Sequence, residues 1–194
     1  ASLRIERGER VAILGAIGSG KTTLLGLLAR LYDPAPGNIL VCGRDVLDWD
    51  LPELRSVFAF APQDAFVFAP DVQKNLRLGS QSRDRHRDTC DDALEYQQIL
   101  DRTHLTGELD LTAAVHAGGR NLSGGQRQRV SLARGWATGA EIFVVDDALS
   151  AIDPYRERRI LMELIEANRT LLYVTHRDTA LEYMDRVYRL EGGE

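Results

Sequence analysis

The 194-residue sequence lacks several features that would place it in familiar classes of protein. It has only two cysteines, Cys42 and Cys90, which are isolated and fit no metal-ligand spacing. We expect both thiols to be reduced, as in a cytosolic compartment. No apolar run approaches the roughly 18 residues of a membrane-spanning helix, and no signal-like segment opens the chain. These residues therefore predict neither a disulfide framework nor a membrane span.

Lysine is scarce, and neither sign of charge dominates. Of 24 basic residues only Lys21 and Lys74 are lysines, and 29 acidic residues bring the net charge to -5. This balance gives no strong attraction to nucleic acid, and we expect no nucleic-acid partner. The charged stretch 79–90 mixes arginines with acids and predicts a solvated loop. Because the chain starts at Ala1 without methionine, we expect it to be a piece of a longer protein.

The stretch from Gly15 to Thr22 matches G-x-x-x-x-G-K-[ST], a phosphate-binding loop. Successive backbone N–H groups form a nest for a triphosphate, and glycines let the backbone come close because they lack Cβ. The following helix directs its free N–H groups at the same phosphates. We expect Lys21 to reach the β- and γ-phosphates and the Thr22 hydroxyl to bind Mg²⁺. The predicted phosphate site comprises Gly15, Ala16, Ile17, Gly18, Ser19, Gly20, Lys21, Thr22 and Thr23.

Short apolar runs alternate with helical patterns along the chain, which predicts an α/β fold. A buried strand is expected before the loop and a helix after it, ending near Asp33-Pro34. The other strands are expected over 38–43, 56–61, 141–147, 170–175 and 185–190, with helices from Pro52, over 71–78, around 93–100, over 127–137 and over 154–168.

Two further stretches carry groups suited to a nucleotide. Asp146 ends an apolar strand, and ligands collect at the carboxyl ends of strands in an open parallel sheet, so Asp146 is placed to hold Mg²⁺ directly or through water. Ser123 precedes two glycines and is a plausible N-cap for the helix over 127–137. This is a second helix start suited to binding phosphate.

With these motifs in order, the chain resembles the nucleotide-binding domain of an ATP-binding cassette (ABC) transporter over nearly all its length. The signature Leu122-Ser123-Gly124-Gly125-Gln126, followed by Arg127-Gln128-Arg129, is the most specific match. The stretches 33–39 and 62–76 resemble exporters rather than importers. The other motifs are the P-loop, the Q-loop residue Gln63, the Walker B strand 142–146, the D-loop 150–153 and the switch residue His176.

The resemblance implies one domain over 1–194. It would have a P-loop NTPase core of parallel sheet flanked by helices (1–64 and 136–194), an inserted helical subdomain (65–135) and a small antiparallel β portion. It also implies a head-to-tail dimer in which ATP lies between one domain's P-loop and the other's signature, since a helix start in the lobe lies far from its own P-loop. Transmembrane domains of the same or a partner chain would place it at the cytoplasmic face of the inner membrane.

The resemblance also implies roles for single residues toward ATP and Mg²⁺. Gln63 would contact Mg²⁺ and the surroundings of the attacking water, and His176 would hold the γ-phosphate. Thr22, Gln63 and Asp146 form the implied metal set, and Asp147 stands beside them as the third catalytic candidate with Gln63 and His176. Across the interface the nucleotide would meet Ser123, Gly124, Gly125, Gln126 and Asp153.

The chain departs from the family pattern at Asp147, where a Glu usually polarises the attacking water. The shorter side chain withdraws the carboxylate by about 1 Å, and such a misplacement can cost on the order of 100-fold in rate. We therefore expect slow or absent hydrolysis at this chain's own P-loop. Since the signature is intact, the pattern favours one half of a heterodimeric exporter over a homodimer.

Two other departures concern the nucleotide and the membrane domains. The aromatic residue that stacks on adenine in the family lies upstream of the first residue here, and the stretch 116–120 lacks the acid that exporters often carry. Two alternatives to an exporter motor stay open: a regulatory ATP-binding subunit that does not hydrolyse, and a cassette of a soluble ABC ATPase in DNA repair, chromosome organisation or translation.

Overall fold

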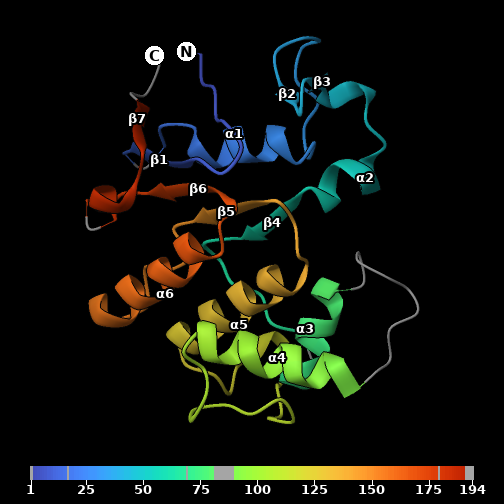
Figure 1. The fold of residues 1–194 in the computed structure, drawn as a ribbon, viewed down its shortest axis with the longest axis vertical. Coiled ribbons are helices and arrows are strands. Elements are labelled where there is room, and N and C mark those ends of the chain that lie inside the picture. The colour runs from blue at the N-terminus through green and yellow to red at the C-terminus, as the bar shows by residue number, and fades with distance from the viewer. Residues whose placement is uncertain (1, 17, 69, 81–89, 179, 191–194) are drawn as a thin grey trace.

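A computed structural model describes residues 2–16, 18–68, 70–80, 90–178 and 180–190 (Figure 1). Its main sheet has five parallel strands in the order β4-β5-β6-β1-β7, and a second sheet pairs two strands antiparallel. The predicted α/β class, a P-loop NTPase fold with a small antiparallel portion, is confirmed. The strands are β1 (Arg10–Gly15), β2 (Leu40–Val41), β3 (Arg44–Asp45), β4 (Phe58–Ala61), β5 (Ile142–Asp146), β6 (Thr170–Thr175) and β7 (Arg186–Leu190).

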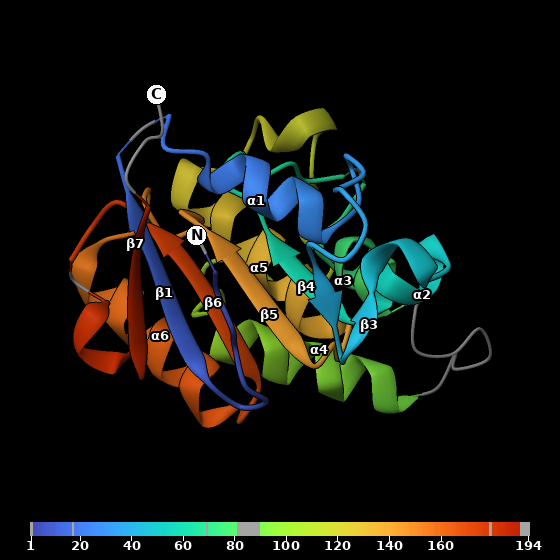
Figure 2. The ribbon, with the colours of Figure 1, turned by 90° about the horizontal axis from the view of Figure 1, so that it is seen from above.

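Helices cover both faces of the main sheet. In Figures 1 and 2, α1 lies on one face with the β2–β3 hairpin, whereas α5 and α6 lie on the other. None of these described helices combines the length and apolar character needed to cross a membrane. The helices are α1 (Lys21–Leu28), α2 (Leu51–Ser56), α3 (Val72–Ser80), α4 (Cys90–Arg102), α5 (Gly124–Ala137) and α6 (Pro154–Glu166).

Strand alternation builds two apolar cores. Successive side chains of a strand point to opposite faces. Val144 in β5 therefore joins the core beside α1 and the small sheet, whereas Phe143 and Val145 join the core shared with α5 and α6. All three are at most 1% exposed. A parallel sheet covered on both faces explains why these strands read as continuous apolar runs.

Several predicted elements are shorter than expected. Strand β4 starts at Phe58 rather than at Ser56, which ends α2, and backbone conformation explains the two largest differences. Helix α1 ends at Leu28 rather than near Asp33, because Arg30 takes φ 47° and the Leu31 N–H donates to the Gly26 carbonyl at 2.8 Å. Strand β2 has two residues rather than six, because Cys42 (φ 52°) and Gly43 (φ 77°) turn the chain into β3.

A helical lobe, which we define as α3, α4, α5 and the segment between α4 and α5, lies beside the core (Figure 1). The helices expected over 71–78 and around 93–100 are confirmed as α3 and α4. Helix α3 packs closely on α5: a Cβ at Gly79 would lie 2.1 Å from the Arg134 carbonyl oxygen. The solvated loop predicted over 79–90 falls largely at 81–89, outside the described residues, and the division at 65–135 stays a prediction.

Asp185, just before the edge strand β7, adds side-chain contacts to the backbone pairing of β7 with β1. Asp185 accepts from the Arg10 backbone N–H at 2.9 Å and from its Nε at 3.0 Å, and their ion pair involves a second guanidinium nitrogen. The side-chain hydrogen bond from Arg10 lowers the pKa of Asp185 to about 2.

Replacing Asp185 with Asn should therefore lower the free energy of unfolding near pH 7. The loss should stay below about 1 kcal/mol, because the pair is partly solvent-exposed. A depressed pKa stabilises the fold above the unfolded value of about 3.9, and this contribution disappears as pH falls toward 2. Urea unfolding of Asp185→Asn at pH 7 and at about pH 2 tests this, with Asp64→Asn as the control. A difference from wild type that persists at low pH would contradict it.

Candidate nucleotide-binding site

The predicted site residues of the core converge at one edge of the main sheet. Strands β5, β6 and β1 are neighbours, with Asp146 aligned to Val174 and Leu14 to Thr175. The P-loop follows β1, Asp146 ends β5 and His176 follows β6, so all lie beyond the carboxyl ends of these parallel strands. Gln63 lies two residues beyond β4 and is exposed.

The glycine loop has the backbone that its sequence demands. Gly18 (φ 83°) and Gly20 (φ 94°) take left-handed conformations, and Gly20 is the N-cap of α1. The Lys21 ammonium donates to the carbonyls of Gly15 at 2.7 Å and Ala16 at 2.8 Å, which holds its charge over the loop. Ile17 lies outside the described residues.

The first turn of α1 offers groups for an anion and a cation. The N–H groups at a helix start have no partner within the helix, and they add to the positive dipole end. Thr22 and Thr23 are exposed in this turn. A phosphate chain fits this donor set of amides and one ammonium.

Asp146 carries the electrostatic features of a cation ligand. Burial raises the pKa of its carboxyl, the neighbouring Asp147 raises it further, and Lys21 acts in the opposite direction. A divalent cation at this edge would stabilise the charged carboxylate. Carboxylate and hydroxyl oxygens are the ligands that Mg²⁺ prefers, so Asp146 and Thr22 fit this ion.

Asp147 is held in an unusual conformation beside the switch histidine. Its φ is 48°, its N–H donates to the Val174 carbonyl at 2.8 Å, and its Oδ2 lies 3.0 Å from Nδ1 of His176. The Asp147 side chain is 12% exposed and that of His176 is 49% exposed. The carboxylate is therefore engaged by the histidine on its solvent side.

The signature forms the start of α5, which begins at Gly124 rather than at Arg127. Ser123 is the N-cap, as predicted: its Oγ accepts from the Gln126 N–H at 3.1 Å, and its own N–H donates to Gln126 Oε1 at 2.9 Å. This reciprocal capping box explains why the helix extends three residues further than its apolar spacing indicated. Gly124 and Gly125 thus form the first helical turn.

The signature contacts the D-loop of the same chain. A Cβ at Gly125 would lie 3.1 Å from the Ala151 carbonyl oxygen, so only glycine allows this approach without a shift. Gln128 accepts from the Ala151 N–H at 2.9 Å and donates to Ser150 Oγ at 3.2 Å. Asp153 caps α6 by accepting from the Arg156 N–H at 3.0 Å. Within the described residues, no hydrogen bond of Ser123 or Gln126 reaches the P-loop.

The sequence gives no sign of the polar residues that surround the signature. Glu108 contacts Arg129, Arg156 and Gln126 from the segment before α5. No motif or spacing marks Glu108 or Arg156. They are brought together only by the packing of α6 against the helical lobe.

A glycine loop entering a helix, with an acid at the end of a nearby parallel strand, defines a P-loop nucleoside-triphosphatase. A family model described as ABC transporter matches residues 1–150. The chain is 40% identical over 195 residues to an ATP-dependent lipid A-core flippase of Burkholderia orbicola (strain AU 1054), covering 100% of this chain and 32% of the flippase. It is 34% identical to the transport/processing ATP-binding protein ComA of Streptococcus pneumoniae (strain ATCC BAA-255 / R6), covering 100% of this chain and 27% of ComA.

The fold has a close relative among solved structures. A bacterial Atm1-family ABC exporter with ATP bound superposes with a TM-score of 0.87 at 30% identity, covering 97% of this chain and 33% of the exporter. The chain belongs to the ABC transporter family. It spans about a third or less of the length of these relatives.

The electrostatic coupling of Asp146 and Asp147 should make nucleotide binding depend on pH. Since Asp147 helps to raise the pKa of Asp146, the Asp147→Asn variant should keep Asp146 ionised to lower pH. Mg²⁺-dependent nucleotide binding should then persist to a lower pH than in wild type. Binding of a fluorescent ATP analogue, titrated with Mg²⁺ across the acid range, measures this. Glu141→Gln, at the opposite end of β5, is the control, and equal acid midpoints in wild type and Asp147→Asn would refute the coupling.

Proposed function

We propose that this chain is the ATP-binding motor domain of an ABC exporter, acting with transmembrane domains of the same or a partner chain at the cytoplasmic face of the inner membrane. Relatives that are named as a flippase and an exporter, and that are about three times longer, support this. The observation that carries it is the convergence of the P-loop, Asp146, Asp147 and His176 on one sheet edge, with a capped signature helix on the lobe.

The chain's own residues supply the binding chemistry of this proposal. Lys21 and the α1 N–H groups bind the triphosphate, while Thr22, Asp146 and Gln63 hold Mg²⁺. When bound, the metal neutralises phosphate charge. Asp147 orients the attacking water and His176 contacts the γ-phosphate. Each of these roles follows from the resemblance, and the convergence of Lys21, Asp146 and His176 beyond the carboxyl ends of β1, β5 and β6 supports them.

Assembly completes the site in this proposal. Ser123, Gly124, Gly125 and Gln126 approach the nucleotide held by a second domain, because their own contacts run to Ala151 and Glu108 rather than to their own P-loop. Asp153 lies at the same interface with the second domain. ATP joins the two domains, and hydrolysis releases them. The coupled membrane domains convert this cycle into export.

We further infer that the site at this chain's own P-loop is slow, and that the partner is a different cassette. The Asp147 carboxylate is one methylene shorter than the usual Glu and lies 3.0 Å from His176 Nδ1, which directs it toward the histidine. The intact, capped signature supports full competence for the partner's site. A degenerate site paired with a competent one is the arrangement of a heterodimeric exporter.

Lengthening the acid should therefore accelerate hydrolysis at this site. In the full-length protein assembled with its partner, with the partner's P-loop lysine replaced, Asp147→Glu should raise ATP turnover by about 10- to 100-fold, because the carboxylate regains about 1 Å of reach. Phosphate release under saturating Mg²⁺ and ATP measures this.

The matched control is Asp147→Asn, which keeps the size but removes the base and should not accelerate turnover. Measurable turnover that is equal in wild type and Asp147→Glu would exclude the slow-site interpretation. Turnover that stays at zero in Asp147→Glu, with ATP binding intact, would favour the regulatory subunit that binds without hydrolysing.

Nucleotide-driven association tests the two-domain site. With Mg²⁺ and a non-hydrolysable ATP analogue, the full-length protein should associate with a second cassette in analytical ultracentrifugation. Ser123→Asp retains an N-cap for α5 but places a negative charge toward the incoming phosphate, and should weaken association at least tenfold. Ser123→Thr keeps cap and charge and serves as control. Wild-type protein that never associates would contradict the proposed function.

A further inference from the structure

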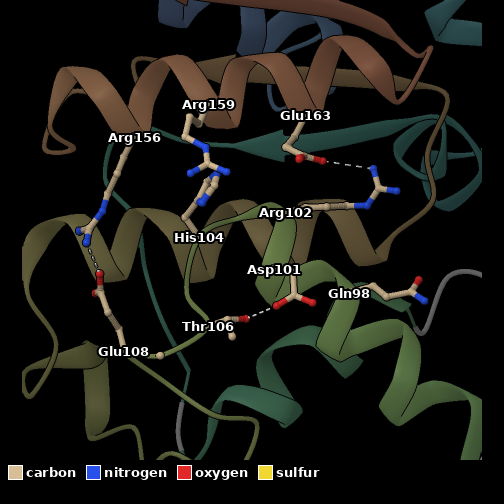
Figure 3. Close-up of a pocket in the computed structure, with 10 residues that line it drawn as sticks. Gln98, Asp101, Arg102, His104, Thr106, Glu108, Arg156, Arg159 and Glu163 are labelled. Atoms are coloured by element: carbon tan, nitrogen blue, oxygen red, sulfur yellow. Dashed lines mark hydrogen bonds and ion pairs between the residues drawn. The ribbon is translucent and has the colours of Figure 1, made fainter.

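A cleft of 740 Å³ separates α6 from α4 and the segment that follows it (Figure 3). Two ion pairs cross this cleft. Arg156 Nη2 lies 2.8 Å from Glu108 Oε1, and Arg102 Nη1 lies 3.5 Å from Glu163 Oε2. The two arginine side chains are similarly exposed, at 44% for Arg156 and 43% for Arg102. The two pairs differ in what else they touch.

Glu108 is the hub on the lobe side of the cleft. Its Oε2 accepts from Arg129 Nη2 at 2.6 Å and from Gln126 Nε2 at 3.2 Å. The Arg129 side chain is only 3% exposed and also donates to the Gly125 carbonyl at 3.3 Å. Glu108 thus holds the residue that completes the capping box of the signature helix.

Arg156 continues the network toward the D-loop. It lies in the first turn of α6, and its Nε is 3.6 Å from Oδ2 of Asp153, the helix cap that ends the D-loop. An unbroken series of polar contacts therefore runs from Asp153 through Arg156 and Glu108 to Gln126. Among the described residues, neither Arg102 nor Glu163 has a hydrogen bond or ion pair with the D-loop or the signature.

A second set of contacts joins the same two elements. Gln128 bonds Ser150 and Ala151, and Gly125 packs against the Ala151 carbonyl. Direct packing and the Glu108–Arg156 ion pair are thus two separate connections between the signature and the D-loop. Two such connections fix an orientation as well as a separation.

We infer that Arg156 and Glu108 are positioning residues that lock the signature to the D-loop of the same chain, so that both elements meet the partner domain as one preformed surface. This inference rests on the proposed function. Preformed geometry avoids the cost of ordering the signature at each association, and a misplacement of about 1 Å is enough to lower turnover substantially.

The test compares Arg156→Gln with Glu163→Gln in the full-length protein. Arg156→Gln frees Glu108 from α6 but leaves its bonds to Arg129, so the lobe keeps its buried charge pair. ATP binding at the chain's own P-loop, measured on unassociated protein, should change by less than about twofold. Association with the partner, and turnover at the site that this signature completes, should fall by about tenfold. Glu163→Gln breaks the other cross-cleft pair and should leave all of these within about twofold.

A double-mutant cycle separates positioning from general destabilisation. If Arg156 acts through Glu108, Arg156→Gln should add little to Glu108→Gln, which already removes the ion pair along with the bonds of Glu108 to Arg129 and Gln126. Arg156→Lys, which cannot reach Glu108 and Asp153 together, should fall between wild type and Arg156→Gln. Thermal unfolding should separate Arg156→Gln from Glu163→Gln by no more than a few degrees.

Each outcome bears on a different conclusion. Equal effects of Arg156→Gln and Glu163→Gln, or additive effects in the cycle, would overturn the positioning role alone. Unsubstituted protein that fails to associate would overturn the proposed function, and the positioning role with it.

Discussion

The parallel register of β5, β6 and β1 is the constraint on which the candidate site depends. Pairing Asp146 with Val174 and Leu14 with Thr175 brings three separate stretches of chain to one edge. The two apolar cores hold these strands in place from both faces, so a one-residue slip would turn every buried side chain to the wrong side. The positions of Lys21, Asp146 and His176 are therefore fixed by core packing, and the loops add only the final few ångströms.

The signature obeys a different constraint, because its placement depends on polar contacts rather than on the sheet. Its helix start is closed by Ser123 and Gln126, tied to the lobe by Glu108 and held against the D-loop by Gln128. The bond from the Gln126 N–H to Ser123 Oγ satisfies a group that would otherwise be orphaned at the helix start. The described hydrogen bonds of this helix start thus run to the lobe and the D-loop, which suits the proposed site completed by a second domain.

Short sequence patterns predict most of the helices and strands, but they predict few of the polar contacts around the site. The P-loop strand and helix, the strand ending at Asp146 and the N-cap at Ser123 follow from patterns of a few residues, and the structure has all of them. The end of α1 at Leu28 depends on Arg30 entering the left-handed region, which apolar spacing does not signal. Contacts such as Glu108 with Arg156 join distant stretches, so no window of sequence contains them.

Both strand register and polar contacts determine the conformation of Asp147. Its backbone is set by the β6 carbonyl that accepts its N–H, and its left-handed φ is one that Asp tolerates better than most residues. A short acid there reaches His176 while adding negative charge beside the buried Asp146, which already resists ionisation. The position therefore places two carboxylates side by side at the end of β5, with Asp147 engaged by the histidine. Under the proposed function, this acid and the intact signature suit the chain to completing a partner's site rather than to driving its own.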